Sequence, residues 1–213
     1  MLSRNSRVRS PALGDVLALC ARELSAVGIA QMQDVAWGAS KDGVTVDEIL
    51  KMYRYKTGRY SFSLPLVTGA LIAGARADVR ERLEACGESI GLLFQVRDDE
   101  LGLFGNEEEL GKPVGSDIRE GKKTILMAFI MEAASPHERD RLESILGSAG
   151  ATQDDVDFVR GLAASARVRS RLAAVTDTLA GQARAAVRAL GCGTSDDRAA
   201  LEGLLDFTIS RSQ

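Results

Sequence analysis

The sequence predicts an all-α protein. Apolar residues recur at helical spacing through almost all of its 213 residues, and no segment shows the sustained apolar/polar alternation of a strand. Pro occurs only 4 times and aromatic residues make up 5% of the chain, so helix breakers and strand-favouring rings are both scarce. No fixed repeat and no Ser/Pro-rich linker divides the chain, so we expect residues 1–213 to form a single domain.

Composition excludes several classes of protein. The 45% of hydrophobic residues indicates a folded chain, and the net charge of −3 offers no basic surface for nucleic acid. Cys20, Cys86 and Cys192 lack metal-site spacing, so we expect three reduced core thiols. The longest apolar stretches, 64–75 and 124–131, are shorter than the roughly 20 residues that span a bilayer. The basic first ten residues lead into no apolar run, so we expect no transmembrane segment and a cytoplasmic protein.

The first expected helix begins at Ser10 and Pro11, which suit the N-cap and the first helical position. Its inward face is predicted to carry Leu13, Leu17, Cys20, Leu24 and Val27, and the same spacing then reaches Gln31 and Asp34. Polar residues that continue an apolar face indicate either a polar cavity or the point where the helix leaves the core.

The next three expected helices repeat this pattern. A capping box at Thr45 and Glu48 opens a helix whose apolar face ends in Lys56. Pro65 begins a second helix that runs to about Ala75. A third begins near Asp78 and carries a buried stripe that ends in Asp98. Charged residues therefore end two buried stripes.

The rest of the chain also reads as helical. An irregular segment, 104–116, precedes a helix that is predicted to be capped by Asp117 and to contain residues 124–134. Ser135 and Thr152 cap two more helices, the second running to about Leu190, and Thr194 caps a last one. We expect about seven helices.

Three oxygen-bearing side chains share one helix face near residue 98. Gln95 stands three and four residues before Asp98 and Asp99. Adjacent carboxylates at the end of a buried stripe need a cation, and oxygen ligands suit Mg²⁺. The alternative is an ordinary solvated pair, as expected for the two Asp-Asp pairs at 154–155 and 196–197 in first helical turns.

Three lysines stand beside small or turn residues: Lys56 on an apolar face, Lys112 in a Gly-Lys-Pro turn and Lys122 before Thr124. Each could extend its ammonium group to solvent along its aliphatic stem. Taken with the aspartates, they also fit a magnesium-bound phosphate group.

The string LLFQVRDDELGLFGNEEELGKPVGSDIREGKKT resembles the second aspartate-rich region of the trans-polyprenyl diphosphate synthases, which include farnesyl and geranylgeranyl diphosphate synthases. Upstream, Gln31 and Asp34 match that family's Gly-Gln-x-x-Asp segment with Ala30 in place of Gly, and Lys56-Thr57-Gly resembles its Lys-Thr helix. The resemblance covers about residues 15–131, and it implies the isoprenoid-synthase all-α bundle and usually a homodimer.

The resemblance also implies site roles and a reaction. Asp98 and Asp99 would coordinate Mg²⁺, Lys56, Lys112 and Lys122 would bind the allylic diphosphate, and Thr57 and Gln95 would face the allylic cation. The family joins an allylic diphosphate to isopentenyl diphosphate and makes a polyprenyl diphosphate five carbons longer. Such chemistry needs positioned charges and a cavity that excludes water.

Two features depart from the family pattern. The second motif lacks its last aspartate, and no first aspartate-rich motif exists in these 213 residues, so they resemble the C-terminal part of the fold. The chain alone is not expected to complete the condensation: it is an incomplete record of a longer enzyme, a truncated relative, or half of a site that a partner completes. The alternative function is a catalytically silent subunit that pairs with a complete synthase and modulates it. An unrelated helical domain would require the whole 94–124 string to match by coincidence.

Overall fold

A computed structural model describes residues 10–105 and 114–210, and all regular structure in these ranges is helical. This confirms the all-α prediction. The helices are α1 (Ser10–Ala39), α2 (Val46–Tyr53), η2 (Arg54–Ser63), α3 (Leu64–Ile72), α4 (Ala77–Phe104), α6 (Ser116–Arg119), α7 (Ile125–Ala133), α8 (Pro136–Ile145), α9 (Gln153–Ala163), α10 (Ala166–Ala189) and α11 (Ser195–Ser210).

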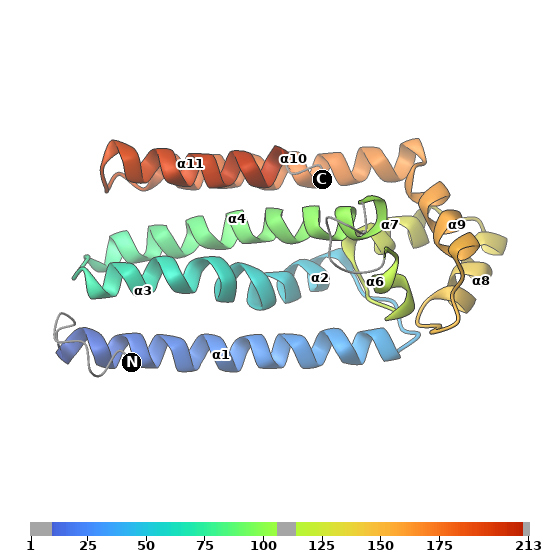
Figure 1. Cartoon of the computed structure of the whole chain (residues 1–213), viewed down its shortest axis with the longest axis horizontal. Helices are drawn as coiled ribbons and strands as arrows, with labels where there is room; N and C mark the ends of the chain where they lie inside the picture. The colour runs from blue at the N-terminus through green and yellow to red at the C-terminus, as the bar shows by residue number, and fades with distance from the viewer. Residues whose placement is uncertain (1–9, 106–113, 211–213) are drawn as a thin grey trace.

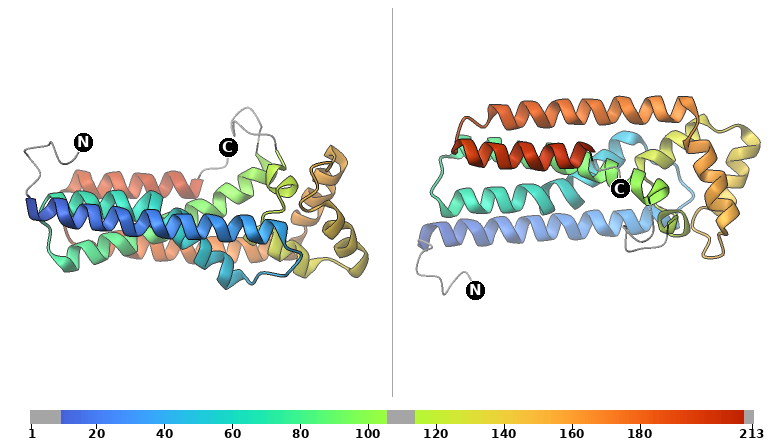
Figure 2. Two further views of the ribbon diagram at one scale, coloured as in Figure 1. Left: turned by 90° about the horizontal axis from the view of Figure 1, so that it is seen from below. Right: turned by 45° about the horizontal axis from the view of Figure 1, so that its top comes forward.

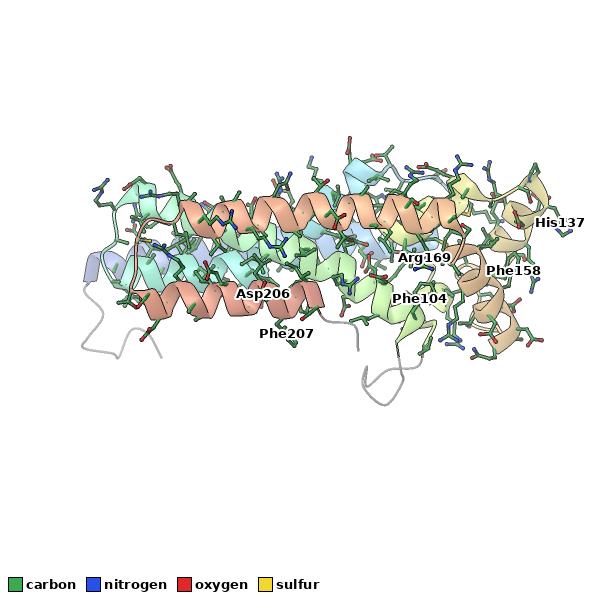
Figure 3. All side chains as sticks on the ribbon, turned by 90° about the horizontal axis from the view of Figure 1, so that it is seen from above. Phe104, His137, Phe158, Arg169, Asp206 and Phe207 are labelled. Atoms are coloured by element: carbon green, nitrogen blue, oxygen red, sulfur yellow. The ribbon has the colours of Figure 1, made fainter. Side chains whose placement is uncertain are left out.

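The long helices lie side by side along the long axis of the molecule, with α1 at one edge and α10 and α11 at the other (Figure 1). Helices α7, α8 and α9 gather at the end where α1 and α4 finish (Figures 1 and 2). One large cluster of buried apolar side chains joins α4 to α2, α7, α9 and α10. Phe104, which ends α4, and Phe207 on α11 lie on the outside, with 45% and 59% of their surface exposed (Figure 3).

A π-helix, η2, joins α2 to α3 so that residues 46–72 form one continuous helical rod. The sequence predicted two separate helices here. Pro65, expected to start a new helix, is the second residue of α3 directly after the π-segment. π-Helical segments are rare, and those that occur often lie at functional sites. The π-helix η2 contains Lys56 and Thr57.

Two close backbone contacts hold elements around this stretch together. A Cβ atom on Gly91 of α4 would lie 2.5 Å from the Cα of Gly58 in η2, so the two helices touch main chain to main chain there. At the end of α1, a Cβ atom on Gly38 would lie 2.8 Å from the carbonyl oxygen of Glu120. Glycine at these positions therefore lets η2 lie against α4, and the end of α1 against the segment after α6.

The predicted inward face of α1 was wrong at two positions, because Leu17 and Leu24 are each 55% exposed. Glu23, which lay off that face, is buried, and so is Asp34, which the predicted spacing reached. Helix α1 carries apolar side chains on two faces, so apolar spacing alone could not select between them. Ion pairs from Glu23 and Asp34 to η2 decide which face turns inward.

Two other predictions of helix ends need correction. Thr124, and not Asp117, caps α7: its hydroxyl accepts a hydrogen bond from the Met127 amide at 3.1 Å. The predicted helix from Thr152 to Leu190 is two helices, because Ser165 caps α10 after α9 has ended at Ala163.

Two further predictions from the sequence concern the cysteines and transmembrane segments. All three cysteines are free, as predicted. Within residues 10–105 and 114–210, no helix combines the length and the apolar character that crossing a membrane requires.

Candidate active site

Side chains from four parts of the chain converge where α4 nears its C-terminal end. They line a small cavity of about 40 Å³, formed by Asp34, Met52, Tyr53, Lys56, Gln95, Asp98, Asp99, Asp117, Lys122, Lys123 and Thr124. The residues come from α1, from the α2–η2 rod, from α4 and from the segment around α6. The fold thus brings together residues that lie up to 90 positions apart in the sequence (34 to 124).

Both carboxylate oxygens of Asp99 have hydrogen-bond partners in this cavity. Asp99 is 7% exposed, its Oδ2 accepts a short hydrogen bond from the Tyr53 hydroxyl, and its Oδ1 accepts one from Gln95 Nε2 at 2.9 Å. The Tyr53 oxygen in turn accepts the Ile125 amide at 3.3 Å, which ties α2 and α4 to the start of α7. Burial raises the pKa of Asp99 to about 7, even though the bonds from Tyr53 and Gln95 oppose the rise.

The two predicted residues of η2 both have polar partners in the site. The Lys56 ammonium pairs closely with Asp34, whose side chain is almost fully buried. The Thr57 hydroxyl donates to Gln95 Oε1 at 2.6 Å. Because Gln95 also donates to Asp99, a chain of hydrogen bonds runs from Thr57 through Gln95 to the second aspartate.

Lys122 approaches the cavity from the loop after α6. Its ammonium lies 2.7 Å from Asp117 Oδ1 and 3.0 Å from Glu120 Oε2. Burial works against the charged form, but the hydrogen bonds and charges of these two carboxylates raise the pKa of Lys122 above its ordinary value. Lys122 is therefore a permanent cation beside Asp98 and Asp117, which line the same cavity.

The structure brings six of the seven predicted site residues to this one cavity or into direct contact with it: Lys56, Thr57, Gln95, Asp98, Asp99 and Lys122. The seventh, Lys112, lies outside the described residues. Sequence reasoning missed Tyr53, which it placed on the apolar face of its helix, and Asp117, which it assigned to a cap. The signal available for Tyr53 was its position three residues before Lys56, one helical turn away.

Two larger cavities, of about 510 and 610 Å³, contain none of the predicted residues, and neither does a third of about 350 Å³ between α1 and α2. The first lies between the α1–α2 loop and helices α7 and α8, and the second between α2, α4 and α10. Neither holds a hydrogen-bonded set of titratable groups like that around Asp99. We therefore place the candidate site by its chemistry and not by cavity size.

A family model described as polyprenyl synthetase matches residues 2–162, three quarters of the chain. The chain belongs to the polyprenyl synthetase family. It is 40% identical over 112 residues to a short chain isoprenyl diphosphate synthase of Methanocaldococcus jannaschii, a match that covers 53% of this chain and 34% of that protein. It is 38% identical over 157 residues to a (2E,6E)-farnesyl diphosphate synthase of Mycobacterium bovis, covering 72% of this chain and 43% of the relative.

Solved structures of the family share the fold. A geranylgeranyl pyrophosphate synthase of Corynebacterium glutamicum, solved with isoprenyl diphosphate and magnesium, superposes with a TM-score of 0.88 at 26% identity, over 96% of this chain and 57% of that one. A polyprenyl synthase of Caulobacter crescentus, solved with calcium and isoprenyl diphosphate, gives 0.80 at 29% identity, over 96% and 60%. This chain thus forms part of an isoprenoid-synthase helical bundle, and it spans less than half of the curated relatives that it matches.

Proposed function

We propose that this chain carries the allylic-diphosphate half of a prenyltransferase site, which elongates an allylic diphosphate with isopentenyl diphosphate. The observation that carries the proposal is the convergence of three lysines and four aspartates on one partly buried cavity. Charged groups lining a small cavity need ligands or counter-ions of opposite sign. A diphosphate bound together with a divalent cation supplies both.

Lys56 and Lys122 are the groups that would bind and orient the diphosphate. Lys56 pairs with Asp34 and Lys122 pairs with Asp117, so both lysines are held at the cavity wall without a ligand. An ammonium group acts on phosphate oxygens as a point charge with three donors. We propose the same role for Lys112, which the resemblance assigns to this group.

The donor set fits Mg²⁺ shared with a diphosphate. Within residues 10–105 and 114–210, no three His, Cys, Asp or Glu side chains cluster closely enough to form a complete metal site. Magnesium sites commonly use one or two carboxylates and complete the shell with phosphate oxygens and water. We propose that Asp98, with Asp117 across the cavity, would hold the ion, and that the buried Asp99 chiefly holds Gln95 and Tyr53 in place.

The proposed reaction breaks the bond between the allylic carbon and the diphosphate oxygen, and the diphosphate leaves with the electron pair. The double bond of isopentenyl diphosphate then attacks the allylic carbon, and loss of a proton leaves the longer chain. Bound Mg²⁺ would stabilise the charge of the leaving diphosphate. Thr57 and Gln95 would direct oxygen atoms towards the positive allylic carbon, and their mutual hydrogen bond fixes both side chains.

Calorimetric titration of an unreactive allylic thiolodiphosphate into the chain, with and without Mg²⁺, tests this half-site. We expect binding that depends on Mg²⁺ and that Asp98→Asn loses. Asp154→Asn is the matched control, because Asp154 stands in the exposed first turn of α9, far from the cavity along the chain. Binding that is equal in all three proteins, or absent from the unmodified chain, would contradict the proposal.

A second candidate function is a catalytically silent subunit that pairs with a complete synthase. Copurification with a longer relative, without turnover of isotope-labelled isopentenyl diphosphate by this chain, would support it. Turnover by a homodimer of this chain alone would exclude it. In either case we propose a cytoplasmic protein that works as a homodimer or beside a related subunit.

A further inference from the structure

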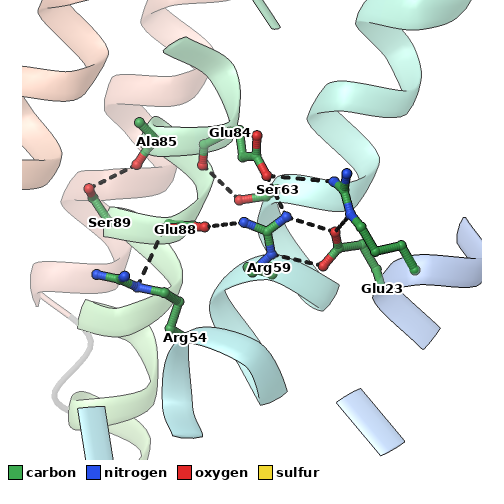
Figure 4. A network of polar contacts seen from close by, with 9 residues as sticks. Glu23, Arg54, Arg59, Ser63, Glu84, Ala85, Glu88 and Ser89 are labelled. Carbon is green, nitrogen blue, oxygen red and sulfur yellow. Dashed lines mark hydrogen bonds and ion pairs between the residues drawn. The ribbon is translucent and has the colours of Figure 1, made fainter. Parts of the chain in front are cut away.

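Arg59 of η2 lies at the centre of a cluster of carboxylates three residues after Lys56 (Figure 4). Its Nε and Nη2 atoms donate to the two oxygens of Glu23 on α1, at 2.9 and 2.8 Å. Its Nη1 donates to Glu88 of α4 at 2.6 Å, and Nη2 also lies 2.5 Å from Glu84. One guanidinium group therefore joins the π-helix to both neighbouring helices.

The cluster is buried at its centre and exposed at its rim. Glu23 is 2% exposed and the Arg59 side chain 18%, whereas the rim arginines Arg22 and Arg54 are more than half exposed. Hydrogen bonding to Glu23 and the nearby carboxylates raise the pKa of Arg59, which stays charged. A buried ion cluster is costly to desolvate, so stability alone is a weak reason for it, and geometric specification is the better-attested one.

Arg59 and Lys56 hold η2 to the same face of α1. Their partners, Glu23 and Asp34, are eleven residues apart, which is three helical turns and about 16 Å along α1. On the opposite side, Gly58 touches the backbone of α4. Loss of the Arg59 anchor would leave Lys56–Asp34 as the remaining ion pair between η2 and α1 among the described residues, so the placement of Lys56 would depend more heavily on the Asp34 contact.

We propose that Arg59 is a positioning residue for the diphosphate site: its contacts with Glu23, Glu84 and Glu88 fix the face of η2 that presents Lys56 and Thr57. The residue touches no ligand in this proposal and acts through its two neighbours. The inference rests on the proposed function, since that function gives Lys56 and Thr57 their ligand.

A double-mutant cycle with Lys56 tests the proposal, with Kd for the allylic thiolodiphosphate and Mg²⁺ as the readout. Arg59→Met is expected to weaken binding on the order of tenfold, as loss of a residue that orients a ligand typically does. In a Lys56→Met background the same change should have a smaller effect, because one of the two residues through which Arg59 acts is gone. Arg59→Lys keeps the charge but not the planar fork, so it should fold and bind with intermediate affinity.

Arg22→Met is the matched control, because Arg22 contacts Glu23 and Glu84 but belongs to α1 and leaves η2 anchored. Its Kd should equal that of the unmodified chain. An equal loss in Arg22→Met and Arg59→Met, or an undiminished Arg59→Met effect in the Lys56→Met background, would overturn the proposal in favour of general weakening of the fold.

A second readout needs no ligand and separates this inference from the proposed function. Arg59→Met and Arg59→Lys should shift the amide NMR signals of Thr57 and Gln95, while Arg22→Met should not. If the unmodified chain fails to bind the analogue but these shifts occur, the proposed function fails and the positioning role stands. Unchanged Thr57 and Gln95 signals in both Arg59 variants would refute the positioning role whatever the binding result.

Discussion

Tyr53→Phe removes one oxygen atom at the point where α2, α4 and α7 meet. That oxygen donates to Asp99 and accepts the Ile125 amide at 3.3 Å, and both partners are buried. A buried polar group that loses its partner costs about 1–3 kcal/mol. With two such groups, of which Asp99 keeps its bond from Gln95, we expect the free energy of unfolding to fall by about 3 kcal/mol.

Thermal unfolding followed by circular dichroism measures this effect. For a chain of this size each kcal/mol lowers the midpoint by about 2–4 °C, so Tyr53→Phe should unfold roughly 6–12 °C lower. Tyr55→Phe is the matched control: Tyr55 is 37% exposed, and its change should stay within about 0.5 kcal/mol. A Tyr53→Phe variant within about 1 kcal/mol of the unmodified chain would refute the argument that this hydroxyl holds two otherwise isolated buried groups.

Two further predictions concern the packing and the charge of the same region. Gly91→Ala should destabilise the chain by about 1–3 kcal/mol in urea unfolding, since a Cβ there would lie 2.5 Å from the Cα of Gly58 and neither backbone can easily move. Gly181→Ala, in the open middle of α10, should instead stabilise it by about 0.5–1 kcal/mol, and a loss of equal size in both would contradict the reasoning. Burial of Glu23 tends to raise its pKa, but the bonds from Arg59 and Arg22 outweigh it and leave that pKa below 4.5. The ionised Glu23 side chain should therefore contribute fully to the free energy of unfolding above pH 4.5, and this contribution should be lost as pH falls through the folded-state pKa of Glu23. Glu23→Gln should flatten the acid side of a plot of unfolding midpoint against pH.

Local signals in the sequence predicted most helix starts. Capping residues at Thr45, Ser135 and Thr152 each begin a helix in the structure, because a cap depends only on residues within one turn. The π-segment of η2 and the break before Ser165 were missed. A π-helix has no composition of its own, and its stability here comes from contacts with α4 that no local pattern contains.

The residues proposed to bind the ligand were easier to predict than the residues that hold them in place. Lys56 and Asp98 stood out because each ends an otherwise apolar stripe, and Gln95 stood out because it lies one helical turn before the two aspartates. Tyr53 did not stand out, since a tyrosine on an apolar stripe is ordinary unless the partner of its hydroxyl is known. The prediction of the buried face of α1 failed for a related reason. Glu23 takes an inward position only where Arg59 from another helix neutralises its charge.

The two adjacent aspartates show why a motif can contain residues with different physical roles. Successive residues of an α-helix differ in direction by about 100°, so neighbouring side chains can meet different partners. On α4 both aspartates line the cavity, and Asp99 also accepts hydrogen bonds from the Tyr53 hydroxyl and Gln95. Both carboxylate oxygens of Asp99 accept hydrogen bonds, one from Tyr53 and one from Gln95. The sequence presents Asp98 and Asp99 as an equivalent pair, but the structure shows that Asp99 is also a contact between α4 and α2.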